Sequence, residues 1–221
     1  MPYQHQYATG EAINLPVGKV VCVGRNYAEH ARELNNPVLT EPLLFIKPST
    51  TLTPMEEGVT LSPSRGPVHY ETEIALLIGE QLTGEVSEQQ AQAAIAGVGL
   101  ALDLTLRELQ DQLKAKAHPW ERAKSFDGAC PLSPFVPADQ FDLRDIPLQL
   151  KINGEVRQQG SSADMITPIV ALLRHIAETF TLLPGDVVIT GTPAGVGVLN
   201  AGDKLEAVIP GILAQRAEVF G

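Results

Sequence analysis

The sequence is poor in cysteine and in long apolar runs. Only two of its 221 residues are cysteine, Cys22 and Cys130, and they form no Cys-x-x-Cys pair. We therefore expect two reduced thiols, as in a cytoplasmic protein, and no disulfide framework. The longest run without a strongly polar residue, 93–102, is half the length that spans a membrane. Because the first residues lack the charged and apolar regions of a signal peptide, we expect none.

Basic charge is scarce as well. The chain has 16 lysines and arginines and 26 acidic residues, which gives a net charge of −10. No basic cluster is longer than a pair, so the sequence argues against a nucleic-acid partner. An anionic substrate would need local cations or a metal ion to overcome the overall negative field. With 44% hydrophobic and 19% charged residues, the chain is not a disordered one, and its length suits one large domain or two small ones.

Short strand patterns broken by turn residues dominate the chain, which has 19 glycines and 17 prolines. The Asn153-Gly154 pair predicts a hairpin with a type I′ turn, and Ser87 with Gln90 has the spacing of a capping box. Region 48–68 is expected to be loop with at most one short strand. Strands are expected at 19–23, 43–46, 70–78, 97–102, 148–152, 155–158, 187–190 and 204–209, and helices at 26–34, 88–96, 105–116 and 167–182. Since strands and helices do not alternate regularly, we predict a mixed, strand-dominated α+β fold.

Three carboxylates form a candidate metal site. Glu71 and Glu73 are two residues apart on the expected strand 70–78, so both lie on one face at the edge of a core. Two partly buried like charges are costly side by side, and a hard cation such as Mg²⁺ or Mn²⁺ removes that cost. Asp103 ends a buried strand and is a third candidate ligand. The alternatives are solvent-facing glutamates on an edge strand and, for Asp103, an N-cap for the helix that follows.

His30 and Glu33 form a candidate acid–base pair. They are three residues apart on the expected helix 26–34 and therefore share a face. A histidine oriented by a carboxylate can act as a general base near neutral pH. The alternative is an exposed pair on a surface helix.

Several other residues could bind an anionic ligand. Arg25, Lys47 and Lys124 could each bind a carboxylate, although each could equally be a surface charge. The glycine-rich loop 191–197 lacks the Gly-Lys-Ser/Thr ending of a P-loop, and 97–99 lacks the third glycine of a dinucleotide fingerprint. We therefore expect no nucleotide site. The loop's backbone N–H groups and the Thr192 hydroxyl could still approach an anion.

Seven motifs follow one another along the chain: Gly24-Arg25-Asn26-Tyr27 with His30 and Glu33, Leu44-Phe45-Ile46-Lys47-Pro48, His69-Tyr70-Glu71-Thr72-Glu73, Ala101-Leu102-Asp103-Leu104-Thr105-Leu106-Arg107-Glu108-Leu109-Gln110, Lys124-Ser125-Phe126-Asp127, Asn153-Gly154, and Pro184-Gly185-Asp186 with Gly191-Thr192-Pro193 and Gly195-Val196-Gly197. Together, over 17–220, they resemble the fumarylacetoacetate hydrolase family. The chain is most similar to its short, single-domain acylpyruvase type, which includes acylpyruvate hydrolases and oxaloacetate decarboxylases. One departure is Leu102, where many members have Asn.

The resemblance implies a fold, an assembly and a site. The expected fold is the family's mixed β-roll with flanking helices, in a homodimer, with an N-terminal extension at 1–16 and the catalytic domain at 17–221. His30 and Glu33 match a dyad on a lid that orders when substrate binds, and Lys124 matches a catalytic lysine. The matched ligands of Mg²⁺ or Mn²⁺ are Glu71, Glu73 and Asp103. The positions matched near substrate are Arg25, Lys47, Gln110 and Thr192.

These features give one leading hypothesis and its rivals. We expect a hydrolase that cleaves the C3–C4 bond of acylpyruvates, which are small anionic 2-oxo acids, through a metal-stabilised pyruvate enolate. His30 would deprotonate water, and Lys124 would stabilise the oxyanion or help deliver a proton. The same site could serve an isomerase or decarboxylase of 2-oxo dioic acids, or an oxaloacetate decarboxylase or tautomerase. A non-catalytic metabolite-binding domain is the rival from another class.

Overall fold

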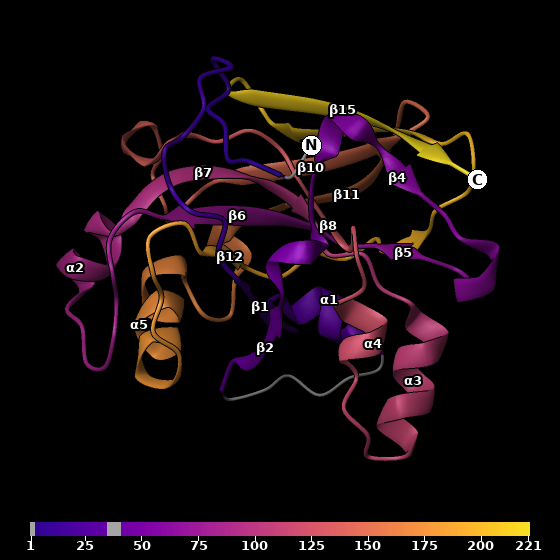
Figure 1. The fold of residues 1–221 in the computed structure, drawn as a ribbon, viewed down its shortest axis with the longest axis horizontal. Helices are drawn as coiled ribbons and strands as arrows, with labels where there is room; N and C mark the ends of the chain where they lie inside the picture. The colour runs from indigo at the N-terminus through magenta and orange to yellow at the C-terminus, as the bar shows by residue number, and fades with distance from the viewer. Residues whose placement is uncertain (1–2, 35–40) are drawn as a thin grey trace.

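The computed structural model describes residues 3–34 and 41–221, and in these ranges an eight-stranded and a five-stranded β-sheet account for most of the regular structure. In the view of Figure 1 the smaller sheet lies over the larger one, and the helices gather on the opposite side of the molecule. The mixed, strand-dominated fold predicted from the sequence is therefore confirmed.

The strands of the larger sheet run in the order β2 (Leu43–Lys47), β1 (Val20–Gly24), β12 (Val187–Ile189), β6 (Thr72–Ile78), β7 (Ile95–Leu102), β8 (Cys130–Leu132) and β3 (Leu52–Pro54), with β9 (Val136–Pro137) paired to β7. The smaller sheet has the order β11 (Glu155–Ser161), β10 (Pro147–Ile152), β14 (Lys204–Ile209), β15 (Leu213–Phe220) and β4 (Val59–Thr60). A separate pair joins β13 (Gly197–Val198) to β5 (His69–Tyr70). The helices are α1 (Ala28–Glu33), α2 (Glu88–Ala93), α3 (Arg107–Ala115), α4 (Glu121–Lys124) and α5 (Ile169–Thr179).

Strand β6 lies at the centre of the core and is buried on both faces. Because side chains alternate along a strand, Ile74 and Leu76 join a cluster that includes the smaller sheet and α5. Ala75 and Leu77 join a second cluster on the other face. Burial of both faces explains the continuous apolar run in this strand. The alternation also places Glu73 on the face of Ala75 and Leu77, at the end of that second cluster.

Two local predictions are confirmed in detail. The Ser87 hydroxyl accepts the Gln90 N–H and the Gln90 amide oxygen accepts the Ser87 N–H, which together form the capping box of α2. Between β10 and β11, Asn153 and Gly154 have φ values of 53° and 85°, as the two central residues of a type I′ turn require.

Three expectations differ from the structure. The expected strand 70–78 is interrupted at Glu71, because β5 pairs with β13 whereas β6 pairs with β7 and β12. Region 48–68 contains two short strands, β3 and β4, and three short 3₁₀ turns, where one short strand at most was expected, because tertiary pairing with β8 and β15 orders both strands. Strand β15 was not predicted, because two of its inward-facing positions are Gln215 and Ala217, which give little apolar signal.

Residues 3–16 pack along the larger sheet. Gln6 and Ala8 exchange backbone hydrogen bonds with Phe135, and Ile13 is buried in the second cluster. The His5 ring is fully buried, with Nε2 3.0 Å from the Gly185 carbonyl oxygen. The segment therefore contributes to the core of the molecule.

Cys22 and Cys130 are buried, unbridged thiols, as the sequence predicts. Burial raises the pKa of the Cys130 thiol to about 12. In the described part of the chain no helix has both the length and the apolar composition needed to cross a membrane.

Candidate metal centre and active site

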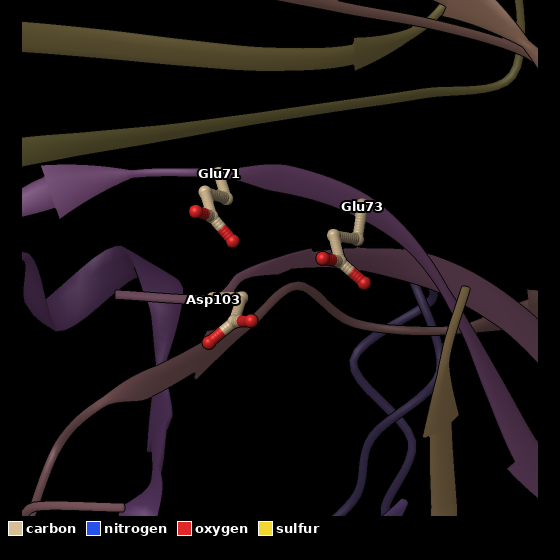
Figure 2. Close-up of side chains that lie close together, drawn as sticks. All are labelled: Glu71, Glu73 and Asp103. Atoms are coloured by element: carbon tan, nitrogen blue, oxygen red, sulfur yellow. The ribbon is translucent and has the colours of Figure 1, made fainter. Parts of the chain in front are cut away.

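The register between β6 and β7 brings three carboxylates together. Glu73 pairs with Ala101, and the Asp103 N–H donates to the Glu71 carbonyl at 2.8 Å, so the ladder continues one step past the end of β7. Glu71 therefore lies opposite Asp103, and opposed residues share a face of the sheet. Glu73, two residues along, shares that face too. Figure 2 shows the three carboxylates turned toward one another.

The geometry of this triad suits a hard divalent cation. Glu71, Glu73 and Asp103 are 5%, 2% and 2% exposed, and one oxygen from each lies within 4.8 Å of the others. Oxygens bound octahedrally to Mg²⁺ at about 2.1 Å stand about 3 to 4 Å apart, so small movements would complete such a site. Among the residues that the structure describes, none donates a hydrogen bond to the buried Asp103 Oδ1, so this oxygen is available as a ligand atom.

Both alternatives for the carboxylates are wrong. Glu71 and Glu73 are buried, so they are not solvent-facing residues of an edge strand. Helix α3 begins at Arg107 with Leu106 as its N-cap, so Asp103 does not cap it.

Buried cations neutralise part of the triad. Lys124 Nζ donates to Glu71 Oε2 at 2.8 Å and to Asp103 Oδ2 at 2.6 Å, which places the ammonium between two of the carboxylates. The Arg107 guanidinium pairs with the other oxygen of Glu71. Lys47 Nζ donates to the carbonyls of Lys124 and Ala129, and it lies 2.8 Å from Asp103 Oδ1 outside hydrogen-bonding geometry.

The protonation states follow from this arrangement. Burial opposes ionisation of Glu71, but the charges of Lys124 and Arg107 outweigh it and hold the pKa of that carboxyl well below its usual value. Burial would lower the pKa of Lys124, but Asp103 and Glu71 outweigh it and raise the pKa.

Glu73 differs from the other two carboxylates. Burial, and then the charges of Asp103 and Glu71, raise its pKa well above the usual value, and its Oε2 accepts the Gly191 N–H at 2.6 Å. In the described residues Glu73 has no cationic side chain within ion-pair distance. A further positive charge beside it would therefore be stabilising.

Helix α1 holds the candidate acid–base pair. His30 is 5% exposed, and its Nδ1 lies 3.3 Å from Glu33 Oε2. The other oxygen of Glu33 accepts the Gly195 N–H at 3.0 Å, which fixes the carboxylate from a second side. The alternative of an exposed surface pair is wrong for His30. With Nδ1 directed at Glu33, Nε2 is the ring nitrogen left to accept a proton.

A cavity of about 40 Å³ collects most of the predicted site residues. Its lining includes Arg25, His30, Glu71, Glu73, Asp103, Lys124 and Thr192. Glu33, Lys47 and Gln110 do not line it but contact residues that do: Glu33 contacts His30, Lys47 contacts Lys124, and the buried Gln110 accepts a hydrogen bond from Arg107 at 3.0 Å. A direct contact of Lys47 or Gln110 with substrate stays a prediction.

The loop after β12 is held by side chains. The Thr192 hydroxyl donates to the Thr72 carbonyl at 2.8 Å and accepts the Gln158 Nε2–H at 2.7 Å. These two hydrogen bonds anchor the loop beside β6 and β11, where the Gly191 N–H reaches Glu73. Gln158 was missed from the sequence, because nothing local distinguishes it from its neighbours on β11.

Three further residues of the cavity were also missed. Arg107 stands in the motif 101–110 but was assigned no role from the sequence, and Lys114 follows it by seven residues. That spacing is two helical turns, so both lie on one face of α3, a signal that could have identified Lys114. Trp120, the one tryptophan of the chain, lines the cavity beside them.

Comparison with known proteins shows the family of this chain. The family model for the C-terminal domain of fumarylacetoacetate (FAA) hydrolase matches residues 19–220. The chain is 49% identical over 211 residues to the oxaloacetate tautomerase YcgM of Escherichia coli K12, covering 95% of this chain and 96% of that protein. It is 43% identical over 202 residues to the mitochondrial oxaloacetate tautomerase FAHD1 of Rattus norvegicus, covering 90% of each chain.

A solved structure is similar over nearly its whole length. It is the fumarylpyruvate hydrolase of Pseudomonas aeruginosa in complex with Mn²⁺ and pyruvate, with a TM-score of 0.91 and 32% identity, covering 99% of this chain and 96% of that one. All three of these relatives are named as enzymes. The family match, the identities and the shared fold together show that this chain is an enzyme that belongs to the fumarylacetoacetate hydrolase family.

Proposed function

We propose that this enzyme uses a divalent metal ion to interconvert the keto and enol forms of oxaloacetate. The observation that carries the proposal is that three buried carboxylates, Lys124 and His30 line one cavity. The choice among reactions follows the 49% identity to the E. coli oxaloacetate tautomerase. The acylpyruvate hydrolase suggested by the sequence becomes the second candidate.

Glu71, Glu73 and Asp103 would hold the cation, with Mg²⁺ and Mn²⁺ as the candidates, because both prefer oxygen ligands. When bound there, the cation supplies Lewis-acid stabilisation for the negative charge that develops on a 2-oxo acid as it enolises. Lys124 keeps a full positive charge beside the same carboxylates and can donate a hydrogen bond to the developing oxyanion.

His30 would move the proton. Its Nε2 accepts a proton from C3 of the keto acid, and the electron pair of that C–H bond moves to the oxygen on C2. The His30 imidazolium then gives that proton to the C2 oxygen, which yields the enol and restores the neutral ring. Glu33 accepts the Nδ1–H and stabilises the imidazolium that forms. No co-reactant is consumed, since one proton leaves carbon and one arrives at oxygen.

The cavity has to open before a substrate can bind. At about 40 Å³ it has room for a few water molecules. One of its walls is formed by His30 and Leu34, at α1 and its C-cap, which fits the lid that the family resemblance implies. We propose that α1 moves outward to admit the acid and returns to exclude bulk water.

Hydrolysis of acylpyruvates remains the second candidate, supported by the likeness to the Pseudomonas fumarylpyruvate hydrolase. It would use the same enolate-stabilising groups, but His30 would deprotonate a water that attacks C4. Decarboxylation of oxaloacetate and isomerisation of 2-oxo dioic acids need the enolate without that water.

Substrate turnover with products measured in parallel tests the proposal. Enzyme supplied with Mg²⁺ or Mn²⁺ is given oxaloacetate, acetylpyruvate and fumarylpyruvate, while enol absorbance and pyruvate are followed together. A tautomerase consumes the oxaloacetate enol faster than buffer does and releases no pyruvate. Pyruvate from the acylpyruvates would instead establish the hydrolase, and no rate above buffer with any of them would refute both.

We further propose that the enzyme acts as a homodimer in the cytoplasm, with 17–221 as its catalytic domain. Light scattering coupled to size-exclusion chromatography gives the assembly, and a monomeric mass would refute a homodimer.

A further inference from the structure

Two cations at the cavity, Arg25 and Lys114, have no acidic partner in the part of the chain that the structure describes. Arg25 follows β1 and Lys114 lies in the last turn of α3, and both line the cavity with the carboxylate triad. Neither makes an ion pair or a side-chain hydrogen bond with any residue in 3–34 or 41–221. Partial burial, and then the positive charges of Arg107 and Arg25, lower the pKa of Lys114. Arg25 and Lys114 therefore repel each other electrostatically.

Among the described residues, no carboxylate lies within ion-pair distance of either cation. The charge of Asp111, three residues before Lys114 on α3, favours the charged form of Lys114, but the two side chains make no ion pair. The residues outside the described ranges, Met-Pro at 1–2 and Asn-Asn-Pro-Val-Leu-Thr at 35–40, contain no carboxylate side chain. The two cations can therefore bind an anion that is not part of the chain.

The charge balance of the cavity points to a doubly charged ligand. Its lining has four cationic side chains, Arg25, Arg107, Lys114 and Lys124, against three carboxylates. A divalent cation on the triad would leave three positive charges in excess, with histidine counted as neutral. This excess of positive charge lies at one cavity of a chain whose net charge is −10. A dianion neutralises it better than a monoanion does.

The positions of the cations divide the ligand into two ends. Lys124 and Arg107 are paired with the triad, where the C1 carboxylate and 2-oxo group of a substrate would bind. Lys114 is at the exposed end of the lining, with its ammonium 5.6 Å from the centre of the Trp120 ring. This cation–π contact holds the long lysine side chain beside Trp120, which lines the same cavity.

We propose that Lys114, assisted by Arg25, binds the distal carboxylate of the substrate and selects dicarboxylic 2-oxo acids over monocarboxylic ones. This inference rests on the proposed function and names the substrate class of that same site. Lys114 is a specificity residue here and takes no part in the proton transfer.

Binding of two matched, unreactive 2-hydroxy acids tests the inference. L-malate and L-lactate share the chelating end, and only malate has a second carboxylate. Calorimetry on Mn²⁺-loaded enzyme is expected to give malate at least about tenfold tighter binding than lactate, the scale of one charge-assisted hydrogen bond. In Lys114→Gln the advantage of malate falls to about twofold or less, and in Lys114→Arg it is largely kept.

Lys116→Gln is the matched control. Lys116 is the exposed C-cap of the same helix and does not line the cavity, so its removal takes the same charge from the same region. The control is expected to keep the wild-type preference for malate. If it lost the preference equally, a general field rather than a Lys114 contact would be responsible, and the inference would be overturned.

Turnover separates this inference from the proposed function. In Lys114→Gln, kcat/KM for oxaloacetate is expected to fall about tenfold, mainly through KM. If the variant keeps the wild-type malate preference while the wild type turns over oxaloacetate, the inference fails and the proposed function stands. If the wild type binds neither acid and turns over no 2-oxo acid, both fail.

Discussion

Replacing Lys124 with methionine removes the ammonium from the carboxylate triad while keeping a side chain of similar length. In the wild type this ammonium lies 2.8 Å from Glu71 Oε2 and 2.6 Å from Asp103 Oδ2, and it is 4% exposed. The variant therefore leaves two buried carboxylates with less positive charge. Arg107 still pairs with Glu71, and Lys47 still approaches Asp103.

The expected loss of stability is large. Removing one partner of a buried ion pair costs about 3 to 5 kcal/mol, because the remaining charge stays desolvated. For a chain of this size 1 kcal/mol corresponds to about 2 to 4 °C in melting temperature, so the variant should melt roughly 6 to 20 °C lower in EDTA. A bound Mn²⁺ would supply the missing positive charge, so Mn²⁺ should stabilise the variant more than the wild type.

Thermal unfolding followed by circular dichroism, in EDTA and in Mn²⁺, measures both effects. Lys151→Met is the matched control, since Lys151 is 35% exposed and lies 3.5 Å from Glu206 Oε2 in a surface pair. Its loss should cost less than about 1 kcal/mol, with no dependence on metal. If Lys124→Met melted at the wild-type temperature in EDTA, or gained no more from Mn²⁺ than the wild type, the proposed neutralisation of the triad would be refuted.

Three further substitutions test other parts of the account. Glu33→Gln keeps a hydrogen-bond acceptor for His30 but removes the negative charge of the carboxylate. In steady-state kinetics kcat should fall about tenfold or more, with KM little changed. An unaltered kcat would contradict the role of Glu33. Gly191→Ala puts a Cβ 2.8 Å from the Cβ of Asn26 on a backbone with φ of +96°. We expect the free energy of unfolding in urea to fall by about 1 to 3 kcal/mol, and Mn²⁺ binding to weaken because Gly191 contacts Glu73. Wild-type values of both would refute the predicted strain at this position. Burial lowers the pKa of His5 in the folded state, so as pH falls below 6.5 the unfolded chain takes up a proton first and the wild type loses stability. His5→Gln should therefore lose less stability than the wild type between pH 7 and pH 5. If the free energy of unfolding had the same pH slope in both proteins, His5 would not contribute.

The sequence predicted those strands whose pattern reflects burial. The apolar run of β6 and the Asn153-Gly154 turn are local signals, and both appear in the structure as expected. The break at Glu71 was not predictable, because it depends on β5 pairing with a strand more than a hundred residues away. Strand β15 has few buried apolar positions, so its period-two pattern is weak.

The carboxylates of the site could be predicted, but most of their partners could not. Glu71 and Glu73 are identified by their spacing of two, and Asp103 by the apolar strand before it. Lys124 meets Glu71 across 53 residues of sequence, a contact that no local pattern encodes. The resemblance to a family supplied Lys124, whereas Lys114 lay outside the matched motifs and emerged only from the lining of the cavity.

Direct binding of Mn²⁺ tests the central claim, that the triad is a divalent-metal site. Free Mn²⁺ is counted by electron paramagnetic resonance as the ion is titrated into wild-type protein and into Asp103→Asn, which keeps the shape of the side chain and removes its charge. The account predicts one tightly bound ion per wild-type chain and at least tenfold weaker binding in the variant. No bound ion in the wild type, or equal binding by the two proteins, would contradict it.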